Sequence, residues 1–166
     1  MMKNRSINIL IVALLLLVVM SVVLFVFIEY AHEVFEENIT VSADGVTRSV
    51  KAVKDLKLNP TESKEYNVNL VCEASGDYHI SLDFKEKRDG GMKKFVNVTV
   101  SLGDDVMYEG DLATLLDTEK VIEFDGTLEA DDPLPVTVRY EMPREIGNEA
   151  QGTSADFKVN FVIVKN

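Results

Sequence analysis

Tyr78-His79-Ile80-Ser81-Leu82-Asp83-Phe84 decides the fold class, because apolar and polar side chains alternate along residues 78–84 without interruption. Such alternation is typical of a β-strand with one face in a core and the other in water. The same pattern recurs at residues 66–72, 96–102, 136–142 and 155–163. We therefore predict that half-buried strands build most of this protein.

Stretches rich in Gly, Pro and Asp separate these segments and predict turns or loops. They lie at residues 75–77, 87–91, 103–105 and 129–135. Two shorter apolar segments, residues 39–41 and 46–53, flank Ala43-Asp44-Gly45. Glycine at the end of so short a connection favours a β-hairpin between them.

One short helix is expected within this series of strands. Asp111 is a suitable N-cap, and Leu112, Leu115 and Leu116 form an apolar stripe with helical spacing. With eight or nine short strands, the pattern predicts an all-β, jelly-roll-like sandwich of two antiparallel sheets. The chain has no Trp, which favours a jelly roll over an immunoglobulin-like core, and its single cysteine excludes an intramolecular disulfide.

Charge and hydropathy divide the chain into unequal parts. Residues 1–28 contain Lys3 and Arg5 and no acid, so they carry +2 of the net charge of −11 and the remainder carries −13. A domain this acidic does not neutralise phosphates, which excludes nucleic acid as a partner. We expect any membrane contact to come from the amino-terminal segment, because an anionic surface repels the rest.

Twenty residues from Ile9 to Ile28 contain no charge and are long enough to cross a bilayer as a helix. Basic residues precede the run, so the amino terminus is expected inside the cell and the acidic part outside. Residues 1–28 are thus predicted to be either a retained signal-anchor or a cleaved signal peptide. Residues 29–38 are predicted to be a helical stalk, and residues 39–166 an extracellular β-sandwich.

No set of residues predicts catalysis. His32 has Glu36 instead of a second His four residues later, and His79 lies on the polar row of a strand, so a zinc protease is excluded. Cys72 lies on an apolar row, where a neutral buried thiol is expected. We predict that the protein is not an enzyme and needs no cofactor.

Calcium is the metal ion for which the sequence offers ligands. Carboxylates gather in two expected loops, at Asp104 and Asp105 and at Asp131 and Asp132. A solvated acidic surface explains the same residues, and no twelve-residue calcium loop is present. Both interpretations stay open at this point.

The last part of the chain resembles the carboxyl end of the TasA/camelysin family of Gram-positive secreted matrix proteins. A Pro, then Gly-Asn-x-x-Gln-Gly, then a Phe-containing alternating strand carries the resemblance over residues 134–166. The matching residues are Pro143, Gly147, Asn148, Gln151, Gly152 and Phe157. The resemblance implies an extracellular structural protein of the biofilm-matrix type, whose partners are further copies or sister matrix proteins.

In that family an amino-terminal strand of one subunit completes the sheet of the next, so the resemblance implies a donor strand here. The candidate donor lies within the first two apolar segments and carries Ile39, Val41, Val46 and Val50. The alternative function is a membrane-anchored monomeric β-sandwich that binds a glycan, a peptide or calcium through loops at one end.

Overall fold

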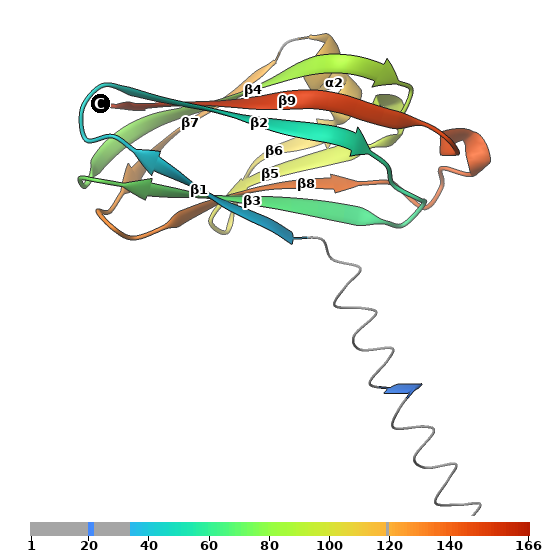
Figure 1. Ribbon diagram of the computed structural model, residues 1–166, viewed down its shortest axis with the longest axis horizontal. Coiled ribbons are helices and arrows are strands. Elements are labelled where there is room, and N and C mark those ends of the chain that lie inside the picture. The colour runs from blue at the N-terminus through green and yellow to red at the C-terminus, as the bar shows by residue number, and fades with distance from the viewer. Residues whose placement is uncertain (1–19, 22–33, 119) are drawn as a thin grey trace, which may run out of the picture. The chain divides into compact units, whose positions relative to one another are not determined.

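The protein is seen here as a computed structural model that describes residues 20–21, 34–118 and 120–166 (Figure 1). Residues 34–166 form one compact unit, separate from residues 1–33. Its strands are β1 (Val34–Val41), β2 (Val46–Leu56), β3 (Ser63–Cys72), β4 (Gly76–Gly90), β5 (Asn97–Leu102), β6 (Asp105–Asp111), β7 (Val121–Leu128), β8 (Leu134–Glu141) and β9 (Ser154–Lys165). Its short helices are η1 (Lys93–Phe95), α2 (Leu112–Asp117) and η2 (Asn148–Ala150).

Two sheets pack face to face, which confirms the prediction of an all-β sandwich with one short α-helix. One sheet has five strands in the order β1-β3-β8-β5-β6, and the other has four in the order β2-β9-β4-β7. The strands β4 and β9 pair over most of their length at the centre of the four-stranded sheet (Figure 1). The strand order places β1 and β2 on one side of the sandwich and β6 and β7 on the other.

Three predictions about the first two strands are wrong. Residues 34–38 belong to β1, so they are not part of a helical stalk, and residues 29–33 lie outside the described part. The segments 39–41 and 46–53 do not form a hairpin, because β1 and β2 belong to different sheets. The sandwich is also not wholly antiparallel, since β1 pairs with β3 in parallel.

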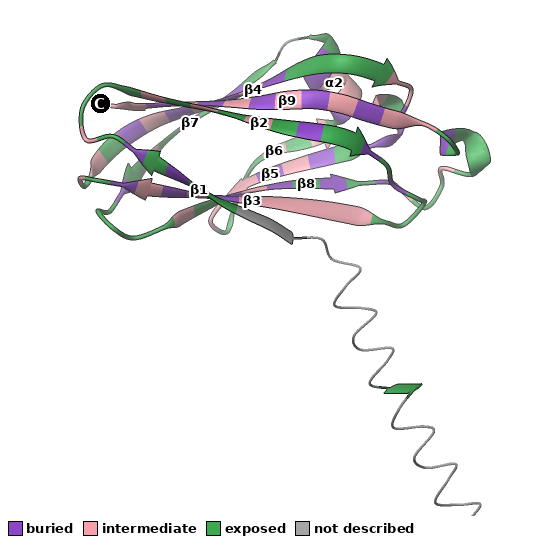
Figure 2. Ribbon diagram, viewed as in Figure 1, coloured by how far each residue is buried: buried purple, intermediate pink, exposed green. Residues whose placement is uncertain are grey.

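The core lies between the sheets and is built by the inward rows of the alternating strands (Figure 2). Along β9 every second residue from Ala155 to Ile163 is buried, as the alternation predicts. The largest side chains that are almost completely covered include Tyr78, Phe84, Tyr140, Phe157 and Phe161. Burial of each such side chain stabilises the fold by roughly 1.5–3 kcal/mol.

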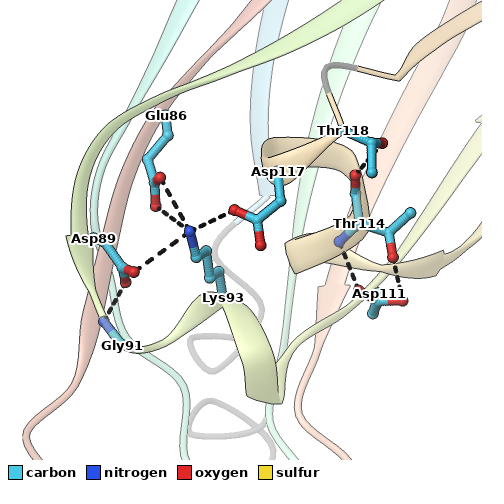
Figure 3. Close-up of polar contacts among 8 residues, drawn as sticks. All are labelled: Glu86, Asp89, Gly91, Lys93, Asp111, Thr114, Asp117 and Thr118. Carbon is cyan, nitrogen blue, oxygen red and sulfur yellow. Dashed lines mark hydrogen bonds and ion pairs between the residues drawn. The ribbon is translucent and has the colours of Figure 1, made fainter.

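The helix α2 begins where the sequence predicts, at a cap formed by Asp111. The Asp111 carboxylate accepts hydrogen bonds from the backbone N–H of Thr114 at 2.6 Å and from its hydroxyl at 2.8 Å (Figure 3). These bonds lower the pKa of Asp111. Because the cap satisfies a free N–H of the first turn, it fixes the start of a helix of six residues.

A cluster of charges joins η1 and α2 to β4. The Lys93 ammonium lies 2.7 Å from Asp117, 3.0 Å from Glu86 and 3.4 Å from Asp89 (Figure 3). Only 14% of the Lys93 side chain is exposed. Its hydrogen bonds, first to Asp117 and then to Glu86, raise the pKa of Lys93 well above its usual value.

Candidate functional site at the sheet edges

The four candidate donor residues are divided between two surfaces. Ile39 and Val41 of β1 are buried in the core, with 5% and 1% of their surface exposed. Val46 and Val50 of β2 lie on the outer face, 45% and 54% exposed. The structure therefore supports β1 alone as a strand with core anchors, and assigns the β2 valines to the surface.

Strand β1 is attached to the body of the sandwich through β3. It lies at the end of the five-stranded sheet and pairs in parallel from Val34 opposite Glu65 to Val41 opposite Cys72. The side-chain amide of Asn69 donates a hydrogen bond to Asn38 at 3.2 Å. The other long side of β1 has no strand partner among the described residues, so its main chain is available for pairing.

An apolar groove of about 500 Å³ opens between the edges of the two sheets beside β1 and β2. Phe161, Tyr66 and Tyr140 contribute to its walls. At its mouth, Lys51 of β2 forms an ion pair with Glu37 of β1, so one contact joins the edge strands of the two sheets.

Tyr140 is the least satisfied polar residue beside this groove. Its hydroxyl is completely buried and has no hydrogen-bond partner within the described residues. Its ring packs edge-on against Tyr66 at 5.6 Å and Phe157 at 5.5 Å between ring centroids. Burial raises the pKa of Tyr140, so this hydroxyl stays neutral.

Five of the six residues that resemble the matrix-protein motif lie in the connection between β8 and β9, and Phe157 lies in the core. Gly147, Asn148, Gln151 and Gly152 line a small pocket of about 190 Å³ against the connection between β2 and β3. Gly152 has a φ of 72°, a conformation that favours glycine. The motif thus serves as a compact loop that turns the chain into β9.

The four candidate calcium ligands are exposed. Asp104 lies in the turn between β5 and β6, Asp105 is the first residue of β6, and Asp131 and Asp132 lie between β7 and β8. Across residues 34–118 and 120–166, no group of three or more His, Cys, Asp or Glu side chains is placed to hold a metal ion. The structure therefore does not bring these carboxylates together as a calcium site.

Cys72 and His79, the two other residues considered for catalysis in the sequence, each have one defined polar contact. The Cys72 thiol is buried and donates to the backbone oxygen of Glu129 at 3.0 Å. His79 lies beside Asp125 on the outer face, with 2.9 Å between Nδ1 and the carboxylate. The Cys72 thiol thus satisfies a backbone oxygen inside the fold, and the His79 ring contacts an acid on the neighbouring strand β7.

Two features were not predicted from the sequence: the Glu37–Lys51 ion pair and the exposed valine on edge strand β7. The two ion-pair partners are fourteen residues apart and belong to different sheets, so no local pattern connects them. On β7, Val121 is 43% exposed at the far end of the four-stranded sheet. The alternation in residues 121–128 was the available signal, since it already assigns Val121 to the outer row.

The apolar run from Ile9 to Ile28 lies outside the described residues, apart from Met20 and Ser21. Within the described part of the chain, none of the helices has the length and apolar character that a membrane span requires.

This chain is only distantly similar to the known proteins with which it was compared. No protein-family model matches the chain, and no curated protein matches it. A β-glucosidase from Paenibacillus barengoltzii is similar at 5% identity and a TM-score of 0.35, over 77% of this chain and 11% of that one. The CUB1-EGF-CUB2 domains of rat MASP-1 are similar at 10% identity and a TM-score of 0.36, over 76% of this chain and 42% of that one.

A family 35 carbohydrate binding module from Clostridium thermocellum is similar at 9% identity and a TM-score of 0.34, over 72% of this chain and 92% of that one. At identities and TM-scores this low, the similarities carry no argument about function.

Proposed function

We propose that this chain is a non-enzymatic, extracytoplasmic structural protein of the biofilm-matrix type. Its jelly-roll-like body assembles by edge-strand pairing with further copies or sister matrix proteins, and residues 1–28 deliver it to the membrane. The resemblance of residues 134–166 to the TasA/camelysin family supports this proposal. The observation that carries it is the position of β1 as a separable strand at the edge of the five-stranded sheet.

Strand β1 has the features of an exchangeable element. It precedes the rest of the sandwich in sequence, it pairs only through β3, and it contributes Ile39 and Val41 to the core. If β1 leaves its own sheet and enters that of a neighbour, the same hydrogen bonds and apolar contacts re-form. The exchange therefore costs little free energy, and protein concentration decides which arrangement is populated.

A disulfide between β1 and β3 tests the exchange. Asn38 and Asn69 are register partners whose side chains already touch, so Asn38→Cys with Asn69→Cys places two thiols opposite each other. In the full chain we expect the oxidised double variant to remain monomeric by light scattering and to assemble after reduction. A matched disulfide inside the same sheet, Thr99→Cys with Arg139→Cys, joins register partners on β5 and β8 and should not prevent assembly.

The two single variants give a second measurement. Chains with Asn38→Cys are mixed with chains with Asn69→Cys and then oxidised. Exchange of β1 predicts a disulfide between two different chains. If the mixture yields no cross-linked dimer and the locked double variant assembles like the unmodified chain, β1 exchange is wrong. A chain that stays monomeric under all conditions would instead favour the monomeric binding module.

A further inference from the structure

The two free edges of the four-stranded sheet carry opposite charge. Strand β2, at one end, has the exposed bases Arg48 and Lys54 against one acid, Asp55, while its third base, Lys51, is paired with Glu37 of β1. Strand β7, at the other end, has two acids and no base. The protein as a whole has a net charge of −11, so a strand with more bases than acids is unusual for this sequence.

Exposed large apolar side chains of the sandwich also gather on edge strands. They are Val46 and Val50 on β2, Val106 and Met107 on β6, and Val121 on β7. Edge strands of soluble proteins commonly carry features that discourage pairing with other chains. Exposed valines on β2 and β7 do the opposite, since β-branched side chains pack well across a strand pair.

Strand direction allows the two edges to pair. Each neighbouring pair in the four-stranded sheet is antiparallel, so β2 and β4 run one way while β9 and β7 run the other. When one copy follows another head to tail with the same face outward, β7 of the first therefore lies antiparallel to β2 of the second. The alternating directions continue across the junction.

The outward rows of the two strands also match in register. If Arg48 of one copy lies opposite Glu123 of the next, antiparallel pairing places Val50 opposite Val121 on the same outer face. Both members of each pair are exposed in the isolated subunit. One register thus forms an opposite-charge pair and an apolar pair, each of which stabilises adjacent antiparallel strands.

We infer that the β2 edge of one copy pairs with the β7 edge of the next, with Arg48 opposite Glu123, to extend the four-stranded sheet from subunit to subunit. This contact is heterologous, so repetition yields an open filament unless the rotation between copies closes a ring. The junction is confined to this sheet, because β1 of the five-stranded sheet has no base to pair with Asp105 and Glu109 of β6. The inference rests on the proposed assembly function and names the surfaces that meet.

Charge reversal tests the pairing in the full chain, kept in non-ionic detergent because of the apolar run at residues 9–28. Arg48→Glu and Glu123→Arg each place like charges opposite each other, and each should raise the protein concentration needed for assembly by about tenfold. The double variant restores the pair in reversed order and should return to near the unmodified value. Arg144→Glu is the control, since it makes the same charge change on an exposed loop outside the edges.

The outcomes separate this inference from its premise. If Arg48 instead protects the edge, as basic residues on edge strands do, its replacement by Gln leaves assembly unchanged or promotes it, and the inference is overturned. Failure of the double variant to recover also overturns it while leaving β1 exchange intact. A chain that never assembles refutes the proposed function itself, and the edge contact with it.

Discussion

Replacement of Lys93 by Met should weaken the fold at the junction of η1, α2 and β4. Methionine keeps the apolar stem of the side chain but removes the ammonium, so Glu86, Asp89 and Asp117 lose their shared partner. An ion pair near the surface contributes about 0.2–1 kcal/mol, so three such pairs contribute about 0.6–3 kcal/mol. Repulsion among the remaining carboxylates adds to the loss, so we expect the free energy of unfolding to fall by about 2 kcal/mol.

Urea denaturation is the appropriate assay, because urea does not screen charges. Lys94→Met is the matched control: it removes the same charge from the next residue, which is exposed and lies 4.8 Å from the centre of the Phe95 ring. High salt should reduce the difference between the two variants. If Lys93→Met is within about 0.5 kcal/mol of Lys94→Met, the cluster does not contribute as the distances imply.

The raised pKa of Lys93 also fixes the sign of its pH dependence. Its contribution is fully present below the unfolded value, about 10.4, and is lost as the pH rises through the higher folded value. The stability difference between the unmodified chain and Lys93→Met should therefore persist from neutral pH into mild alkali and shrink in strong alkali, and it should also shrink in acid as Glu86, Asp89 and Asp117 are protonated. A difference that already disappears near pH 8 would contradict this assignment.

Three further changes can be measured in the same urea assay. Asp111→Ala removes the N-cap and should cost about 1 kcal/mol; because the pKa of Asp111 is lowered, this loss should shrink as the pH falls through the folded value. Gly90→Ala places a Cβ 2.3 Å from the backbone oxygen of Ser154 and should cost about 1–3 kcal/mol, whereas Gly147→Ala meets nothing within 4 Å and should be nearly neutral. Tyr140→Phe removes a buried hydroxyl without a partner, so stability should stay equal or rise; a loss above about 1 kcal/mol would reveal a hydrogen bond.

The sequence predicts the individual strands better than their partners. Alternation in residues 78–84 and 155–163 assigns the buried rows correctly, because side-chain direction repeats every two residues. The same pattern contains no information on which sheet a strand joins. The short connection after Val41 therefore favours a hairpin in the sequence, whereas in the fold it crosses from one sheet to the other.

Two local irregularities also escaped sequence reasoning. Lys87–Gly91 has the composition of a turn, yet β4 continues through Gly90, since pairing with β9 supplies its hydrogen bonds. On β2 the register shifts between Val53 and Leu56, and Asp55 has a φ of 52°. A bulge there changes which residues face inward, which explains why Val46 and Val50 face water.

The candidate site was only partly predictable for a similar reason. Ile39 and Val41 could be assigned to an early apolar strand from composition alone. The groove beside them depends on Glu37, Lys51 and Tyr140, which come from three strands in two sheets. Such a site is defined by tertiary pairing, whereas the predicted acidic loops were defined by composition and are not brought together.

The central position of β9 has a consequence for how the polypeptide matures. Residues 154–165 lie between β2 and β4, so neither of those strands has its main neighbour until this segment has been synthesised. Contacts so distant along the chain form late and slowly. A truncated chain that lacks residues 154–165 should therefore remain unfolded and sensitive to proteases.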